Sequence, residues 1–485
     1  MSTPTARKNS PKLLLLSIGA STVFLTAALP ASAWQLGERI VLQPQAEATE
    51  WRPGQPIILR PPGGPIAAPL TTAPMLSTLP IPVSPLVAPQ HAYNFEYKDP
   101  YFSTLTSRLL KPSREAKILM LDELPGRDQV AILGPRAKIE ITAYVQAHPA
   151  PLMFVIPGLG GTAIDGSAQW LAEQYFDAGF SALVMPSPFS WKFVLSQSTT
   201  GVPGFTPADV SDLMAVMKQA RELATSRLRL RYTRQAVVGY SLGAVHAAFV
   251  RKMDHERPYL GIERAIMIDP PLDFRIAIPT LDRLQAIGKR YSFDQREIIM
   301  GGVIKAGSAL LARDVKSPDY FVGLDRALRL DTDQAAYLIG ASFRETLRDA
   351  IFASQQIIDL GLLHIPASSY RRSARQSEAA RISFQDYIGK GSYPFWKQRL
   401  GVDWSLDRFF ESCDLRGLRA ELIKDPAYRL IHNADDFLNQ PDDLAKLARA
   451  MGRRATIYPY GGHVGNLWQP ETRAMLLRNA QDLLN

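Results

Sequence analysis

A serine flanked by glycines is the residue of this chain that most clearly predicts chemistry. The segment Gly239-Tyr-Ser-Leu-Gly243 fits the pattern G-x-S-x-G, with an apolar run before it and a helical pattern rich in small residues after it. In this context, a sharp strand-to-helix turn lifts the serine hydroxyl above the carboxyl end of a sheet, and the glycines let neighbouring backbone approach. The pattern therefore predicts that Ser241 is a nucleophile; a tight structural turn with an inert serine is the alternative.

A serine hydroxyl needs a base before it can attack a carbonyl group. The chain has seven histidines, and His463 stands in a glycine-rich segment directly after the last predicted strand. A loop at that point can reach back over the sheet, so His463 is the predicted base. A loop histidine that caps a helix or faces solvent is the other interpretation.

The base in turn needs a carboxylate to orient it, and the segment 431–438 offers two after another buried strand. Asp436 is favoured because an acid followed by two apolar residues is usual for this loop, and Asp435 is the alternative acid. Asp269, at the end of an earlier strand, is a more distant candidate. His432 is expected to pack or hydrogen-bond near the acid rather than to act in the reaction.

Two backbone donors should hold the oxyanion of a tetrahedral intermediate. The N–H of Leu242, the residue after the nucleophile, is one. Leu159 is the preferred second donor in the loop Pro157-Gly-Leu-Gly-Gly161, with Gly158 and Gly160 as alternatives. This loop lacks the Lys and Ser/Thr of a phosphate-binding loop, so nucleotide binding is not expected. The mechanism needs no cofactor, and no Cys/His cluster predicts a metal site.

Alternating strand and helix patterns position these residues. A parallel sheet with helices on both faces is predicted from about residue 117 onward. The predicted strands are 118–121, 138–145, 152–156, 181–185, 235–238, 265–268, 428–431 and 455–458. The predicted helices are 168–178, 207–230, 244–253, 442–451 and 470–484.

A long stretch of mostly helical patterning interrupts the alternation and predicts a lid or cap at residues 273–425. The core is accordingly divided into 96–272 and 426–485. Aromatic side chains of the insertion suggest a pocket for apolar acyl groups, although the interior of a lid would need the same residues. They are Tyr320, Phe321, Tyr337, Phe343, Tyr393, Phe395, Trp396 and Trp404.

The first 33 residues have the pattern of a signal peptide: a basic start, an apolar core and Ala31-Ser-Ala33 at the predicted cleavage site. Export to the periplasm or out of the cell is expected, with an uncleaved membrane anchor as the alternative. Residues 34–95 form a proline-rich arm, which is expected to act as a tether and to make a possible peripheral contact with the cell envelope.

Composition excludes several classes of protein. Hydrophobic residues make up 46% and charged residues 21%, as in globular enzymes. The net charge of +9 is spread without a dense basic block, so nucleic acid is not an expected partner. The one cysteine, Cys413, rules out an internal disulfide.

Residues 117–272 and 426–485 together resemble the α/β-hydrolase superfamily. The nearest likeness is to members with a paired acid, here Asn433-Ala-Asp-Asp436, and a G-G-H histidine loop. The chain order Ser241, Asp436, His463 is the order in that superfamily. The resemblance implies an eight-stranded, mostly parallel sheet of the doubly wound type and acyl-enzyme chemistry on an ester, a thioester or, less often, an amide. Pro157-Gly158 departs from the His-Gly of many members, and the insertion is unusually large.

These observations predict an exported serine hydrolase that cleaves ester or thioester bonds of a small or lipid-like substrate with an apolar acyl group. An acyltransferase with the same three residues is one alternative. A non-catalytic binding or envelope-scaffold protein of the same fold is another. The presence of all three residue types in order argues against the scaffold.

Overall fold

The apolar runs of the sequence form the strands of one sheet in a computed structural model of the chain. The structure describes residues 93–127, 138–311, 320–321, 323–366, 371–401 and 403–484. The predicted signal peptide, and the predicted arm up to residue 92, lie outside the described residues.

Eight strands make up this sheet, in the order β1-β2-β4-β3-β5-β6-β7-β8. β2 pairs antiparallel with β1 and β4, and every pairing from β4 to β8 is parallel. This topology confirms the predicted fold class. The strands are β1 (Lys117–Leu121), β2 (Ile139–Tyr144), β3 (Ala150–Ile156), β4 (Ser181–Val184), β5 (Tyr232–Tyr240), β6 (Ile262–Ile268), β7 (Tyr428–Asn433) and β8 (Ala455–Tyr458).

Helices bury both faces of the sheet, which is why the central strands are apolar along their whole length. Along β3, Leu152, Phe154 and Ile156 pack into one hydrophobic cluster, while Met153 and Val155 pack into another on the opposite face. The first cluster includes side chains of α4 (Thr206–Leu228), α5 (Leu242–Glu256) and α15 (Pro441–Met451). The second includes those of α2 (Gly166–Asp177) and α16 (Pro470–Arg478).

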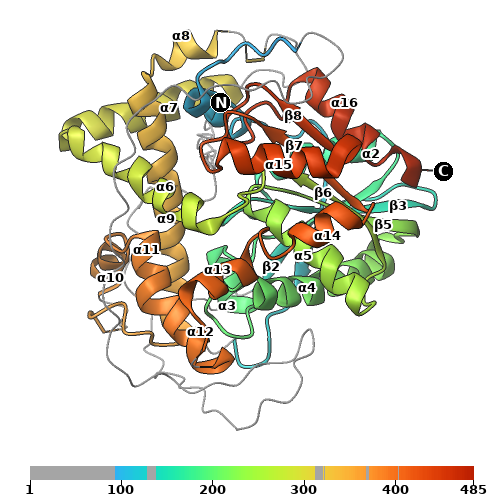
Figure 1. Cartoon of the computed structure of the whole chain (residues 1–485), viewed down its shortest axis with the longest axis horizontal. Helices are drawn as coiled ribbons and strands as arrows, with labels where there is room; N and C mark the ends of the chain where they lie inside the picture. The colour runs from blue at the N-terminus through green and yellow to red at the C-terminus, as the bar shows by residue number, and fades with distance from the viewer. Residues whose placement is uncertain are drawn as a thin grey trace, which may run out of the picture.

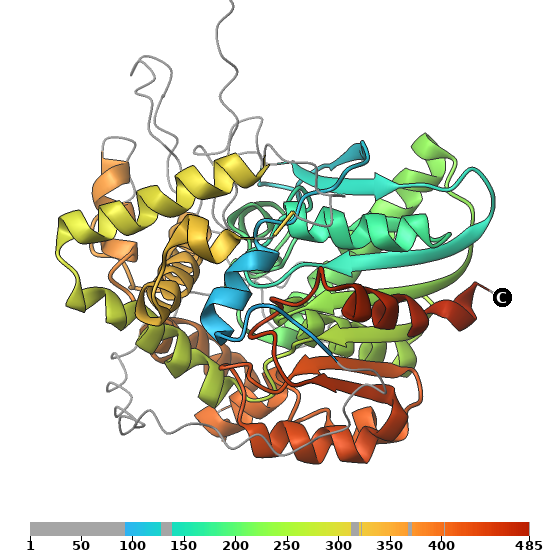
Figure 2. The ribbon, with the colours of Figure 1, turned by 90° about the horizontal axis from the view of Figure 1, so that it is seen from above.

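A helical insertion separates β6 from β7, and most of it lies to one side of the sheet in both views (Figures 1 and 2). Its longest helix, α9, packs against α6 and against α3 (Trp191–Ser196). Among the described residues, no helix has the length and apolar character needed to cross a bilayer. The helices of the insertion are α6 (Phe274–Ala286), α7 (Phe293–Leu311), α8 (Leu324–Leu328), α9 (Thr332–Ile357), α10 (Arg372–Ala379), α11 (Phe384–Tyr387), α12 (Tyr393–Leu400), α13 (Leu406–Cys413) and α14 (Arg419–Lys424).

One short helix near the described N-terminus, α1 (Pro100–Ser107), was not among the predicted elements. The carboxylate of Asp99 accepts hydrogen bonds from the amides of Tyr101 and Phe102, and the proline that follows Asp99 occupies the first helical position. Just before this helix, the Phe95 ring is fully buried and packs 5.6 Å from the ring of Trp468. The end of the predicted arm therefore belongs to the folded core.

Candidate active site

Ser241 lies on a strained turn between β5 and α5. Its backbone has φ 57° and ψ −129°, a conformation that residues other than glycine rarely adopt. A Cβ atom on Gly239 would lie 2.0 Å from the carbonyl oxygen of Gly243, so the turn closes only with glycine at this position. The strand-to-helix turn that the sequence predicts around Ser241 is therefore present, with α5 beginning at the next residue.

A continuous chain of hydrogen bonds links Ser241 to His463 and Asp436. The Nε2 atom of His463 lies 2.8 Å from the Ser241 Oγ atom, and its Nδ1 atom lies 2.9 Å from the Asp436 Oδ2 atom. All three side chains are buried. Because a carboxylate only accepts, the histidine donates from Nδ1, and Nε2 is then free to accept the serine proton.

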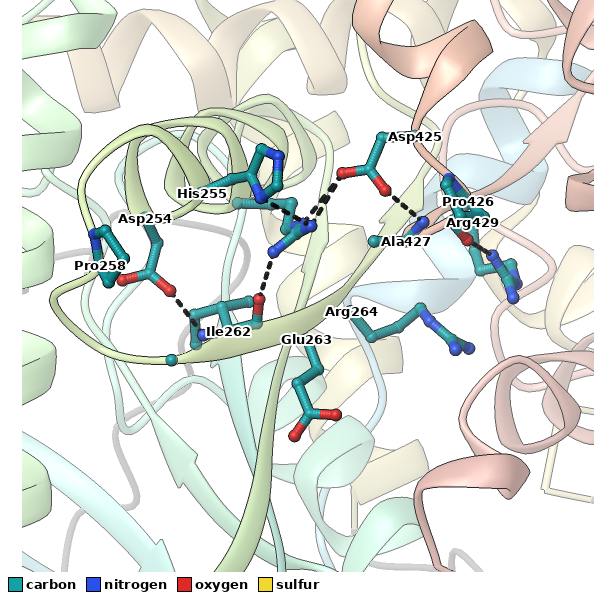
Figure 3. Close-up of a pocket in the computed structure, with 12 residues that line it drawn as sticks. Asp254, His255, Pro258, Ile262, Glu263, Arg264, Asp425, Pro426, Ala427 and Arg429 are labelled. Atoms are coloured by element: carbon teal, nitrogen blue, oxygen red, sulfur yellow. Dashed lines mark hydrogen bonds and ion pairs between the residues drawn. The ribbon is translucent and has the colours of Figure 1, made fainter.

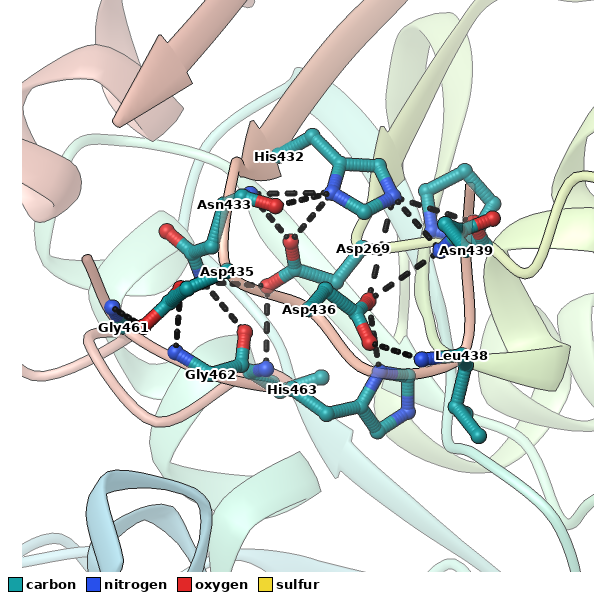
Figure 4. Close-up of polar contacts among 12 residues, drawn as sticks. Asp269, His432, Asn433, Asp435, Asp436, Leu438, Asn439, Gly461, Gly462 and His463 are labelled. Carbon is teal, nitrogen blue, oxygen red and sulfur yellow. Dashed lines mark hydrogen bonds and ion pairs between the residues drawn. The ribbon is translucent and has the colours of Figure 1, made fainter. Parts of the chain in front are cut away.

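The two adjacent acids of the loop after β7 point to different partners (Figure 4). Asp436 faces His463 and accepts a hydrogen bond from the Leu438 amide. Asp435 accepts hydrogen bonds from the amides of Gly461 and Gly462, at 3.2 and 2.9 Å, and so holds the backbone of the histidine loop. The structure thus brings Asp436, and not Asp435, to the histidine; the catalytic role of each residue stays a prediction.

Asp269 does not contact the His463 side chain. Its carboxylate accepts hydrogen bonds from the backbone amides of Asn433 and Val464, at 2.8 and 3.0 Å, and from the side-chain amide of Asn433. It thereby ties the loop after β7 to the histidine loop. His432 packs between Asp269 and Asp436, as expected from the sequence.

The loop after β3 lies directly against Ser241. A Cβ atom on Gly158 would lie 3.4 Å from the Ser241 Oγ atom, and Leu159 and Leu242 line a cavity together with Ser241. The assignment of Leu159 as an oxyanion donor, with Gly158 and Gly160 as alternatives, stays a prediction.

Helix α1 supports the histidine loop, and this support was missed at the level of sequence. The His463 amide donates to the Thr104 Oγ1 atom at 2.8 Å, and the Thr106 hydroxyl donates to the Gly465 carbonyl at 2.8 Å. A Cβ atom on Gly462 would lie 2.0 Å from the Pro100 carbonyl oxygen, so the contact needs glycine there. The Asp99-Pro100 pair, a helix-start signal, could have revealed the helix.

The cavity beside Ser241 has a volume of about 90 Å³ and a mostly apolar lining. Of the eight aromatic residues that suggested a pocket in the insertion, only Phe343 lines this cavity. The others pack elsewhere in the hydrophobic clusters, as expected if they fill the interior of the insertion. The aromatic lining comes instead from Phe189, Phe274, Phe343, Phe384, Tyr387 and Phe410.

Burial shifts the pKa of two titratable side chains in the cavity wall toward the neutral form. Burial lowers the pKa of His246 to about 3. Burial also raises the pKa of Asp209 well above its usual range, and the nearby Asp212 adds to this effect. Burial in the cavity wall therefore disfavours charge on both side chains.

A second cavity, of about 570 Å³, lies at the amino ends of β6 and β7 (Figure 3). The reactive ends of parallel strands are their carboxyl ends, so this cavity is on the wrong edge of the sheet for Ser241. Charged groups in its wall already have partners within the protein. The Arg251 guanidinium forms an ion pair with Asp425 at 3.0 Å, and the Asp254 carboxylate accepts hydrogen bonds from three backbone amides.

Asp269, His432 and Asp436 form the one group among the described residues close enough to hold a metal ion. The set does not fit a metal. The His432 Nε2 atom faces the Pro270 carbonyl oxygen at 3.1 Å, which requires an N–H rather than a lone pair, and the Asp436 Oδ2 atom already accepts from His463. The three side chains are arranged as ion pairs.

No family model and no curated protein matches the chain. Solved structures that it is similar to include a thermostable carboxylesterase from a metagenomic library (15% identity, 80% of this chain and 95% of that one, TM-score 0.37). They also include an esterase of Pyrococcus furiosus, which is 10% identical, with 82% of this chain and 98% of that one covered and a TM-score of 0.35. A third is a thioesterase domain from the curacin biosynthetic pathway, which is 12% identical, with 76% of this chain and 99% of that one covered and a TM-score of 0.31.

Proposed function

We propose that the protein is an exported serine hydrolase that cleaves an ester or thioester with an apolar acyl group. The observation that carries this proposal is the buried hydrogen-bonded chain from Ser241 through His463 to Asp436, built on a strained turn. A scaffold protein would have no use for a strained serine with a base at 2.8 Å. Export rests on the signal pattern of residues 1–33.

The reaction follows from the proton positions. The Ser241 Oγ atom attacks the acyl carbonyl while the His463 Nε2 atom takes its proton, and Asp436 stabilises the resulting imidazolium. The amides of Leu159 and Leu242 hold the oxyanion. His463 then gives its proton to the departing alcohol or thiol, leaving an acyl-serine. A water molecule loses a proton to His463, attacks the acyl carbon and releases the acid, and the proton returns to Ser241.

The first test is labelling of the purified protein with a fluorophosphonate, which reacts with activated serines. We expect labelling of the wild-type protein, none of Ser241→Ala, and a large decrease for His463→Ala. Circular dichroism of the variants controls for folding. A folded wild-type protein that stays unlabelled, even after the insertion is removed or loosened with detergent, would argue for the scaffold alternative.

The size of the cavity predicts a limit on acyl-chain length. Ala277 lines the cavity from α6 and is buried. We expect Ala277→Phe to lower kcat/KM for an octanoyl ester by more than about tenfold and to leave an acetyl ester within about threefold, because lost methylene contacts cost on that order. Initial rates on a series of p-nitrophenyl esters measure this.

The matched control is Ala286→Phe, which adds the same side chain at an exposed position of the same helix. It should leave the chain-length series unchanged. Equal losses for both esters in Ala277→Phe would contradict the assignment of this cavity to the acyl group.

A further inference from the structure

His432 is fully buried between two carboxylates, one on each side of its ring. Its Nδ1 atom lies 3.1 Å from the Asp269 Oδ1 atom, and its Nε2 atom lies 3.8 Å from the Asp436 Oδ2 atom. The Nε2 atom also lies 3.1 Å from the Pro270 carbonyl oxygen. Figure 4 shows Asp436 between the rings of His432 and His463, with Asp269 beside it.

These contacts determine the protons on the ring. The Nε2 atom faces the Pro270 carbonyl, which can only accept, and also the Asn439 side-chain nitrogen at 3.2 Å. That nitrogen has two other acceptors, the Pro270 carbonyl and the Asp436 Oδ2 atom, both at 3.3 Å, so Nε2 can carry the proton that Pro270 accepts. On the other side, the Asn433 amide lies 2.9 Å from Nδ1 but also donates to the Asp269 carboxylate at 2.8 Å, so it does not need Nδ1 as an acceptor. A proton on Nδ1 then meets the Asp269 carboxylate and the Asn433 carbonyl oxygen, at 3.1 and 3.0 Å. With both nitrogens protonated, the ring is an imidazolium.

The electrostatic environment agrees with this assignment. Burial lowers the pKa of His432, but the hydrogen bond to Asp269 and the charges of Asp269 and Asp436 outweigh it and raise this pKa to about 9. The other titratable groups of the cluster are Asp435, whose pKa burial raises to about 7, and His463 beyond Asp436. One buried cation thus offsets half of the charge of the two buried acids.

One oxygen of Asp436 serves both histidines. Its Oδ2 atom accepts from His463, faces His432, and lies 3.3 Å from the side-chain nitrogen of Asn439. The Leu272 amide donates to the Asn439 side-chain oxygen at 2.7 Å, which fixes the direction of that amide. The Asp436 Oδ2 atom is therefore surrounded by hydrogen-bond donors.

We propose that His432 is a positioning residue for the proposed reaction: a permanently charged imidazolium that keeps Asp436 ionised and directed at His463. The inference rests on the proposed function. Without a cation here, Asp436 would share a buried site with Asp269 and Asp435, and like charges at such distances favour protonation of one of them. A protonated Asp436 could not stabilise the imidazolium that His463 becomes during the reaction.

The charge state can be measured without any activity. In protein labelled with nitrogen-15 in its histidine rings, we expect the His432 signals to report two protonated nitrogens from pH 5 to 8, without a titration. His432→Gln assigns these signals by their disappearance. A His432 ring with one unprotonated nitrogen at pH 7 would overturn the proposal, whether or not the variant folds.

The role in the reaction is tested by the pH dependence of fluorophosphonate labelling. Glutamine at position 432 keeps a donor for the Pro270 carbonyl but has no charge. Loss of a cation raises the proton affinity of both Asp436 and His463, so the acid limb of the rate profile should move to higher pH by about 1 unit or more. A role in packing alone would lower the rate and leave the limb in place, which would overturn the proposal.

His255→Gln is the matched control, because it makes the same substitution at an exposed histidine at the end of α5. Its profile should match the wild type. The two proposals fail separately in this design: an unlabelled wild-type protein overturns the proposed function and this inference together. A labelled wild type with an unchanged profile for His432→Gln overturns only the inference.

Discussion

Asp436→Asn is expected to lower kcat/KM for a short-chain ester by about 10⁴-fold, as the same change does in other serine triads. Asparagine can present an N–H to the His463 Nδ1 atom, which would leave the proton on Nε2, where it blocks the acceptor that Ser241 needs. The distance of 2.9 Å between Nδ1 and Asp436 makes this residue the orienting group. Steady-state hydrolysis of a p-nitrophenyl ester measures the loss.

Asp435→Asn is the matched control, one residue away in the same loop. Its side-chain oxygen can still accept from the amides of Gly461 or Gly462, and the loss of one such hydrogen bond costs about 1 kcal/mol. The rate should therefore stay within about tenfold of wild type. A larger loss for Asp435→Asn than for Asp436→Asn would reverse the assignment of the two acids.

Gly243→Ala is expected to destabilise the fold by more than about 4 kcal/mol, the range of severe packing defects. A Cβ atom at this position would lie 2.3 Å from the carbonyl oxygens of both Ile156 and Pro157. Both are backbone atoms at the end of β3, so no side-chain rotation relieves the clash. Thermal unfolding followed by circular dichroism, or the loss of soluble protein, measures the effect.

Gly301→Ala provides the control for this prediction. Gly301 lies in α7 and is exposed, and a Cβ atom added to it would have no neighbouring atom within 4 Å. Alanine favours a helix over glycine by about 1 kcal/mol, so this variant should be as stable as wild type or slightly more stable. A Gly243→Ala protein with a melting temperature near that of wild type would show that the turn can accommodate a methyl group after all.

Much of the core could be predicted because its strands are buried on both faces. The continuous apolar run 152–156 predicts a strand with helices packed on both of its faces, and it lies within β3. The turn around Ser241 could be predicted equally well, because the glycine spacing around Ser241 is a local consequence of one turn.

The other parts of the site depend on contacts between distant segments, which a sequence pattern does not contain. Asp435 and Asp436 are adjacent and chemically identical, and only the path of the loop after β7 decides which one faces His463. Helix α1 is too short for a periodic pattern, and the Asp99 cap is its main signal. The aromatic residues of the insertion have the same composition whether they line a cavity or fill an interior, so their placement required the packing itself.

The contact between helix α1 and the histidine loop has a consequence for the order in which the protein is made. The Thr104 hydroxyl and the His463 amide are separated by 359 positions in the chain, and His463 and Ser241 by 222. During synthesis, the N-terminal segments emerge first. The turn around Ser241 and helix α1 are therefore synthesised well before the histidine loop that both of them contact. If the proposed function holds, Ser241 stays unreactive in the nascent chain until the histidine loop docks against α1.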